Sequence, residues 1–440
     1  MEKCSVRKTE IFINDKLGKN IELMHRIIKS INFFNIILFH RATFSPIFSS
    51  GKLRKMTPLL QEINRKMDLH ISNLARAGDP FETKELGGKF SLDGLASCAF
   101  GVETGSFDGK ESEFLYHGKN VFKFDGMKFL KIVLGSMTPN FMKKVMTNLG
   151  IGNAVRYPFA NEHSKFLMHV IEASFKQRKE SKSKRNDLLD MMIEAIEGNL
   201  EDSESDNMHS TDQFEKDAKI LGNIKKKDVS YDDVLATAIL LLAAGYDTTG
   251  TAMSWIFYDL AMNQNAQENL YEEIIEAGPD ANELSYETLQ ALPYLDAVIH
   301  ESLRRHVPVA FLERLCTKDF PIPNSKIVIR KGDFVRLNNI GIMMDPEIYP
   351  NPLDYNPDRF MKEYASDRNP YSFLPFSLGP RNCIGMRFAM YEMKCCISNL
   401  VSKFRFVPCE KTVKYEDLEF DKSEVFGGTT HGLWIKCEER

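Results

Sequence analysis

The most informative stretch of this chain is FSLGPRNCIG, residues 376–385. It presents one cysteine, Cys383, from a turn rich in Gly and Pro, with Arg381 two positions before it. A helix is expected to begin at Met386, directly after the turn. A helix N-terminus stabilises an anion through its dipole and its unpaired N–H groups, and a nearby guanidinium adds to this effect. The pattern therefore favours a Cys383 thiol that ionises readily.

Two glycines make this turn suitable for a flat ligand. Gly379 and Gly385 let the backbone approach such a ligand closely and donate N–H bonds to sulfur. A thiolate presented in this way can bind the iron of a haem, and thiolate ligation favours cleavage of the O–O bond. The alternative is a buried free cysteine at a helix start, which is common in proteins.

The spacing F-x-x-G-x-x-x-C-x-G, with Arg before the cysteine, resembles the haem-binding loop of the cytochrome P450 superfamily. The resemblance implies haem b (iron protoporphyrin IX) as cofactor and Cys383 as the axial ligand of its iron. It also assigns Phe376, Gly379, Arg381 and Gly385 to the cofactor-binding loop. The fold that it implies is mainly helical with small β-sheets, and a long central helix lies over the haem.

Composition is compatible with an enzyme of this kind. The chain has 440 residues, 43% of them hydrophobic, and no linker or internal repeat divides it. The net charge of −4 gives no sign of a nucleic-acid partner. The eight cysteines form no C-x-x-C pair, so we expect neither a zinc site nor covalently attached haem. Free thiols are typical of a reducing environment.

Apolar residues recur mostly at three- and four-residue steps, which predicts helices. The longest runs from Ser230, which forms a capping box with Asp233, to about Asn263. Its apolar middle indicates that it passes through the interior. Short β-like segments are expected over residues 322–336 and 418–436. The other predicted helices cover residues 52–74, 86–100, 142–150, 159–179, 187–196, 293–305 and 386–400.

The long helix carries AAGYDTT at residues 243–249. Small residues leave room against the helix, and a buried acid followed by hydroxyls is costly unless each finds a partner. The motif resembles the oxygen-activation signature A-G-x-D-T-T, which implies that Asp247 and Thr248 are catalytic and relay protons to dioxygen. The alternative is a helix kink in which the threonines bond back to the helix.

Three further residues resemble a structural signature of the superfamily. Glu301 and Arg304 stand three apart on one helix, and Arg359 lies in the segment Pro357-Asp358-Arg359-Phe360. The resemblance implies a triad that braces the segment leading to the cysteine loop. Such pairs are otherwise surface salt bridges worth less than about 1 kcal/mol.

Other positions match the cofactor and substrate contacts of the superfamily. The resemblance implies that Arg314, Arg41 and Arg381 bind the haem propionates. It also implies that residues 308–311 and 425–429 line a cavity for a lipophilic substrate. For any single arginine the alternative is a solvated surface position.

The N-terminus departs from the superfamily pattern. Residues 1–35 match no anchor, hinge or first sheet, and the apolar run at 31–39 is short for a membrane span. We expect an atypical N-terminal segment, 1–35, and a haem-thiolate monooxygenase domain, 36–440, in a truncated or atypical member. The segments ASCAFG at 96–101 and CTKD at 316–319 most resemble the animal microsomal clan that oxidises xenobiotics.

The resemblance implies a monooxygenase that inserts one atom of dioxygen into a lipophilic small molecule. Its electrons would come from an NADPH-dependent flavoprotein reductase, with cytochrome b5 as a second donor, at the cytosolic face of the endoplasmic reticulum membrane. A non-catalytic or vestigial haem-binding protein is one alternative. Another is an enzyme that rearranges a peroxide without a reductase, but such an enzyme needs no proton relay of the kind that Asp247 and Thr248 would form.

We also expect a basic surface for the reductase near the cysteine loop. Arg387 and Lys394 follow the loop, and Lys52, Arg54 and Lys55 stand early in the helix after Gly51. A local basic patch on an acidic chain can steer an acidic partner.

Overall fold

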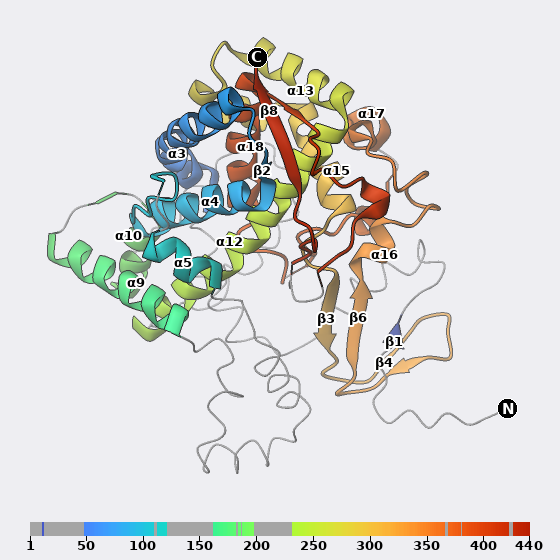
Figure 1. Cartoon of the computed structure of the whole chain (residues 1–440). Coiled ribbons are helices and arrows are strands. Elements are labelled where there is room, and N and C mark those ends of the chain that lie inside the picture. Colours follow the sequence, from blue (N-terminus) through green and yellow to red (C-terminus); the bar gives the residue numbers. More distant parts are fainter. Residues whose placement is uncertain are drawn as a thin grey trace.

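The computed structural model describes residues 11–12, 48–109, 112–120, 162–181, 184–185, 187–197, 231–365, 368–379, 381–421 and 426–440. Within these residues the chain is mainly helical and has small β-sheets, as the sequence predicts. In Figure 1 one long helix, α12, crosses the middle of the molecule. Helices from the N-terminal half lie on one side of it, and the sheet that contains β3 and β6 lies toward the other.

The central helix α12 (Tyr231–Met262) matches the predicted span within a residue at its described ends. It packs along α4 (Thr83–Leu95), and a 2.7 Å hydrogen bond joins Thr83 Oγ1 to Ser254 Oγ. One π-helical turn, Ala96–Phe100, continues α4 and ends at Gly101, whose φ is 65°. The sequence had predicted a single helix over 86–100 that ends at this glycine.

The helices on the α4 side confirm the periodicity predicted from the sequence. The long helix α3 runs over Ser50–Ala77 and buries one apolar stripe, which includes Leu53, Leu60 and Met67. The helices α9 (Glu162–Ser181) and α10 (Leu188–Ile196) likewise lie where helices were predicted, whereas α5 (Glu113–Asn120) had not been predicted. The helix predicted over residues 142–150 lies outside the described residues.

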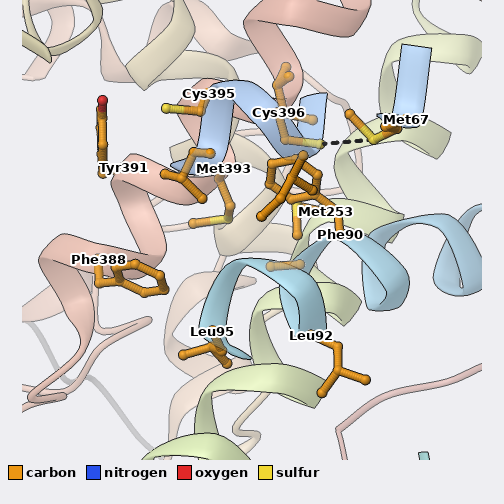
Figure 2. Close-up of a cluster of buried hydrophobic side chains, with 14 of the residues drawn as sticks. Met67, Phe90, Leu92, Leu95, Met253, Phe388, Tyr391, Met393, Cys395 and Cys396 are labelled. Atoms are coloured by element: carbon orange, nitrogen blue, oxygen red, sulfur yellow. Dashed lines mark hydrogen bonds between the residues drawn. The ribbon is translucent and has the colours of Figure 1, made fainter. Parts of the chain in front are cut away.

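The second group of helices surrounds the C-terminal half of α12. It comprises α13 (Gln264–Ala277), the short α14 (Tyr286–Gln290), α15 (Pro293–Arg305) and α18 (Met386–Lys403). The last of these is buried along most of its length, and its side chains meet α3, α4 and α12 in one apolar core. Figure 2 shows this core, in which the Cys396 and Met67 sulfur atoms lie 4.0 Å apart.

Three small sheets complete the described fold. β3 (Phe311–Leu315) pairs antiparallel with β6 (Phe334–Asn338), and β1 (Ile11–Phe12) joins β6 in parallel. β8 (Trp434–Glu439) lies between β7 (Phe404–Val407) and β2 (Phe81–Glu82). β4 (Phe320–Pro321) pairs with β5 (Val328–Ile329).

The β-like segments were only partly predicted. The expected strand over 418–436 is wrong for most of its described length, because β8 begins at Trp434 and, among the described residues from 418 to 433, the bridge Phe420–Thr429 is the only strand-like pairing. The strand Phe311–Leu315 had not been expected.

Candidate active site

A cavity of about 470 Å³ lies between the central helix and the cysteine loop. Its wall is almost wholly apolar, with Leu241, Ala244 and Gly245 contributed by α12 and Leu95 by α4. The predicted cavity segments also reach it, through Pro308, Val309 and Phe426. A cavity of this size and polarity suits flat or lipophilic molecules.

The cysteine loop forms one wall of this cavity. Cys383, Arg381, Phe376 and Gly385 all line it. The Cys383 N–H donates to the Phe376 carbonyl oxygen at 2.8 Å, which closes the loop. Gly379 has a φ of 81°, a conformation that an L side chain rarely adopts. The loop therefore holds its shape through its own backbone.

The start of α18 follows the loop directly. Gly385 is the N-cap residue of this helix, and Cys383 stands two positions before it. The side chain of Cys383 is exposed, whereas Cys395 and Cys396, which lie within α18, are buried in the core. All seven cysteines of the described residues are free thiols. Of the three on this segment, Cys383 is the one that borders the cavity.

On the opposite wall, α12 brings Thr248 to the cavity. Its hydroxyl donates to the Ala244 carbonyl oxygen at 2.6 Å, so its single proton is held by the helix. The oxygen still has lone pairs that can accept a hydrogen bond. The neighbouring Asp247 carboxylate lies 3.7 Å from the ammonium of Lys84 on α4, which the sequence analysis had not considered.

Arg314 lies on β3, on the side of the sheet that faces the loop. It donates to Ser377 Oγ at 3.2 Å, but its Nε is buried and has no hydrogen-bond partner among the described residues. Burial and the neighbouring charge of Arg381 both lower the pKa of the Arg314 guanidinium. Two neighbouring cations beside the cysteine loop, of which Arg381 lines the cavity, suit an anion. Arg41, the third predicted arginine, lies outside the described residues.

These groups together fit a haem. The cavity offers one exposed thiol as a soft ligand, apolar walls for a flat ring and the guanidinium of Arg381 for a carboxylate at the ring edge. Arg314 stands behind this edge, bonded to Ser377, which lines the cavity. The fit rests on Cys383, Arg314 and Arg381, which the fold brings together from two segments almost seventy residues apart.

Behind the loop, Glu301 and Arg304 form a fully buried ion pair. The two residues are joined at 2.7 and 2.8 Å, and Arg359 Nε lies 3.4 Å from the same carboxylate. Arg304 also donates to the carbonyl oxygens of Met343 and Pro352, at 2.9 and 2.8 Å. The three residues of the predicted triad are thus side by side, and they tie α15 to the irregular segment that precedes the loop.

A second buried ionic cluster was missed in the sequence. Asp259, near the end of α12, accepts from Ser302 Oγ at 2.8 Å and pairs with Arg305. His306 Nε2 lies 3.4 Å from the same carboxylate, and the His306 ring stacks on Trp255 at 3.8 Å. The charges of Arg305 and His306 lower the pKa of Asp259 despite its burial. The sequence contained a signal for this cluster, because the charged residues fall on helix faces that the apolar periodicity predicts to be buried.

The prediction that Lys394 belongs to an exposed basic surface is wrong. Lys394 is 1% exposed, and its ammonium lies 2.9 Å from Asp296 and 3.2 Å from the Leu289 carbonyl oxygen at the end of α14. Arg54 is exposed but is paired with Glu287 at 2.5 Å. Lys55 remains exposed on α3.

Comparison with known proteins settles the family. The model of the family described as Cytochrome P450 matches residues 37–424. The chain belongs to the cytochrome P450 family. Its members are haem-dependent monooxygenases that use dioxygen and a redox partner, so this chain is an oxidoreductase of that class.

The curated relatives come from insects and mammals. The chain is 28% identical to cytochrome P450 6k1 of Blattella germanica and 33% identical to cytochrome P450 3A29 of Sus scrofa. Each alignment covers 84% of this chain and 68% of the relative. It is 31% identical to the probable cytochrome P450 6a14 of Drosophila melanogaster, over 90% of this chain and 74% of that protein. These relatives agree with the predicted xenobiotic-oxidising clan.

In the described part of the chain, we find no helix that combines the length and the apolar character needed to cross a bilayer.

Proposed function

We propose that this cytochrome P450 inserts one atom of dioxygen into a lipophilic small molecule with electrons from an NADPH-dependent flavoprotein reductase. Residues 36–440 would form the monooxygenase domain, and 1–35 an atypical segment before it. The observation that carries the proposal is the shared cavity, in which Cys383 and Thr248 stand on facing walls of one apolar space.

Haem b, when bound, would supply the redox chemistry of an iron held by a cysteine thiolate. Cys383 would be its only protein ligand. Arg314 and Arg381 would bind its propionates, as would Arg41, and Phe376, Gly379 and Gly385 would shape the loop around the sulfur. The buried Nε of Arg314 supports the role of this residue, since it lacks a partner among the described side chains.

Asp247 and Thr248 would handle protons on the opposite wall. Because the Thr248 hydroxyl donates to the Ala244 carbonyl, its oxygen is oriented to accept a hydrogen bond from the cavity side. The carboxylate of Asp247 lies beside Lys84, whose side chain is 27% exposed, so this acid is within reach of solvent protons. A general acid must be positioned before its pKa matters, and the place of Asp247 next to Thr248 on the cavity wall supports this role.

Glu301, Arg304 and Arg359 would act as scaffold. None of the three is among the described residues that line the cavity, and their contacts would instead fix the segment that leads to the cysteine loop. Their loss would affect haem retention more than turnover per haem.

The substrate would be apolar, because Leu95, Leu241, Val309 and Phe426 offer it no charged partner. By resemblance, the enzyme would work at the cytosolic face of the endoplasmic reticulum membrane, with cytochrome b5 as a second electron donor. The basic surface for the reductase would then consist of three residues. Lys55 is exposed, and Lys52 and Arg387 are half-buried.

A carbon monoxide difference spectrum of the reduced protein tests the proposal. We expect the absorption of thiolate-ligated haem in the wild type and in Cys395→Ala and Cys396→Ala, and its loss in Cys383→Ala. The two control cysteines lie on the same helix but are buried away from the cavity. Thiolate-type absorption retained in Cys383→Ala would refute the ligand assignment.

A further inference from the structure

One tryptophan of the central helix contacts two of the segments that border the cavity. Trp255 of α12 is 2% exposed, and its indole Nε1 donates to the Gly427 carbonyl oxygen at 3.3 Å. Gly427 directly follows Phe426, which lines the cavity. A buried indole N–H needs an acceptor, and in this protein the acceptor belongs to the backbone of the cavity wall.

The face of the same indole packs on the second segment. The His306 ring stacks on Trp255, with centroids 3.8 Å apart and planes within 5° of parallel. His306 lies two residues before Pro308, which lines the cavity together with Val309. Trp255 itself is not among the described residues that line the cavity, so it can act on a bound molecule only through these two segments.

Buried polar contacts hold the stacked pair of rings in place. Asp259 stands one turn after Trp255 on α12, and its carboxylate lies 3.4 Å from His306 Nε2 and pairs with Arg305. Tyr415 meets the His306 ring edge-on at 5.5 Å. The tryptophan therefore has a fixed place between α12 and the end of α15, from which it can hold a less regular piece of wall.

Backbone bonds near Phe426 stop short of this residue. The Asp421 N–H donates to the Gly428 carbonyl oxygen at 2.9 Å. The next residue toward the cavity is Gly427, whose φ of 85° is a conformation that an L side chain rarely adopts. The indole of Trp255 adds a hydrogen bond at this position, next to the side chain that lines the cavity.

We propose that Trp255 is a positioning residue that sets where the Phe426 wall of the cavity stands. Through its N–H it would hold Gly427, and through its ring it would pack against His306, so the two lining segments would keep a fixed separation. The wall then limits how far a lipophilic substrate extends on this side. This last step rests on the proposed function, whereas the placement of the wall does not.

Amide hydrogen exchange of the full chain tests the placement of the wall. Trp255→Phe keeps a ring that can stack on His306 but removes the N–H donor. The amides of Asp421 and Thr430, which both donate backbone bonds of 2.9 Å in this segment, report its local opening. They should exchange about three- to tenfold faster in the variant, the factor that corresponds to the net contribution of one hydrogen bond.

Tyr258→Phe is the matched control for this measurement. It removes a buried hydroxyl donor from the same helix, whose 2.8 Å bond goes to the carbonyl oxygen of Val413, outside the described cavity lining. The amides of Asp421 and Thr430 should exchange in this variant as in the wild type. Unchanged exchange in Trp255→Phe, or an equal rise in both variants, would overturn the proposal. Because the measurement uses no haem chemistry, its outcome is separate from that of the carbon monoxide test.

Binding of 1-alkylimidazoles to the haem-loaded protein tests the effect on the cavity. The imidazole binds iron, and the alkyl chain samples the apolar walls. The dissociation constant of 1-octylimidazole should rise about fourfold in Trp255→Phe and in Phe426→Ala, the value of about one buried methylene. That of 1-methylimidazole should stay unchanged in both. Unchanged 1-octylimidazole affinity in either variant, or an equal loss for the two imidazoles, would refute the role of this wall.

The double variant Trp255→Phe, Phe426→Ala separates positioning from a general structural effect. If the indole acts through Phe426, the double variant should bind 1-octylimidazole no more weakly than Phe426→Ala alone. Losses that add in the double variant would mean that Trp255 affects the cavity by another route, and would contradict the proposal.

Discussion

Gly87 of α4 and Gly250 of α12 pack backbone against backbone. A Cβ atom on Gly87 would lie 2.6 Å from the Gly250 carbonyl oxygen, and one on Gly250 would lie 2.9 Å from the Cα of Gly88. Asp247 and Lys84 each stand three residues before this crossing, one on either helix. The close approach of the two glycines therefore sets the distance between the acid and the ammonium.

Gly250→Ala should destabilise the protein, because the new methyl group meets backbone atoms that cannot move aside. Overpacking of this kind costs about 1–3 kcal/mol, which exceeds the gain in helix propensity of up to about 1 kcal/mol. Gly51→Ala is the control, since its Cβ would meet nothing within 4 Å at the start of α3. Urea unfolding of the two variants measures the difference. A Gly250→Ala protein as stable as Gly51→Ala would contradict the packing argument.

Glu301→Gln should cost about 3–5 kcal/mol in unfolding free energy and release haem, because it leaves buried Arg304 without its counter-charge. The matched control is Glu62→Gln, which removes another pair at i, i+3, with Arg65, whose side chains are more than half exposed. That change should cost less than about 1 kcal/mol. Denaturant unfolding and haem content measure both variants, and similar costs would mean that burial does not matter here.

Thr248→Ala should keep haem but lower the fraction of consumed NADPH that appears as product. The hydroxyl that would accept a hydrogen bond in the cavity is lost, whereas no part of the cysteine loop changes. Thr248→Ser keeps the hydroxyl and should stay close to the wild type. NADPH oxidation and product formation are measured together. Unchanged coupling in Thr248→Ala would favour the helix-kink interpretation.

Asp93 should make stability depend on pH in the mildly acidic range. Burial raises the pKa of its carboxyl to about 6 in the folded state, although Ser106 donates a hydrogen bond to it. The folded state therefore holds this proton more tightly than the unfolded state. The resulting stability is present below about pH 4 and is lost as the pH rises to about 6.

In the variant Asp93→Asn the side chain cannot ionise, so the variant should not lose this stability as the pH rises. Its unfolding free energy, compared with the wild type, should rise by up to about 3 kcal/mol between pH 4 and pH 7. Denaturant unfolding across this range gives the comparison. Parallel pH profiles for the two proteins would show that Asp93 is ionised in both states.

Lys52→Glu combined with Lys55→Glu should slow reduction by the flavoprotein reductase, more so at low salt, and leave peroxide-driven turnover intact. Arg54 is left in place because of its pair with Glu287. Lys176→Glu on α9, with a side chain 80% exposed, tests whether charge reversal alone has this effect. Equal loss of reductase-driven and peroxide-driven turnover would mean that these basic residues support folding and do not bind the reductase.

Helices such as α3 were predictable because they bury a stripe that repeats along the sequence, whereas α5 and α13 had not been predicted. In α3, Leu53, Leu60 and Met67 stand seven residues apart, and all three are buried. The strand β3 escaped prediction because its inward residues, Leu312 and Arg314, face a pocket edge, whereas Phe311 remains exposed. A strand whose inner face mixes an apolar and a charged residue, and whose outer face carries exposed Phe311 and Leu315, does not show the usual alternation.

The site was predictable where a motif is local, as in the cysteine loop. Contacts between distant segments were not. Lys84 meets Asp247 only because two helices cross, and Lys394 is buried because α18 is enclosed along most of its length. Neither fact is encoded near the residue itself, since each depends on the partner that tertiary packing supplies.

The placement of Arg314 beside Arg381 bears on how the protein acquires its cofactor. Two like charges in a partly buried place repel each other, so the polypeptide alone folds against an electrostatic penalty. A dianionic ring edge would turn that penalty into attraction, and cofactor uptake would then be coupled to completion of folding. Simple anions and salt should accordingly stabilise the chain before haem uptake more than after it.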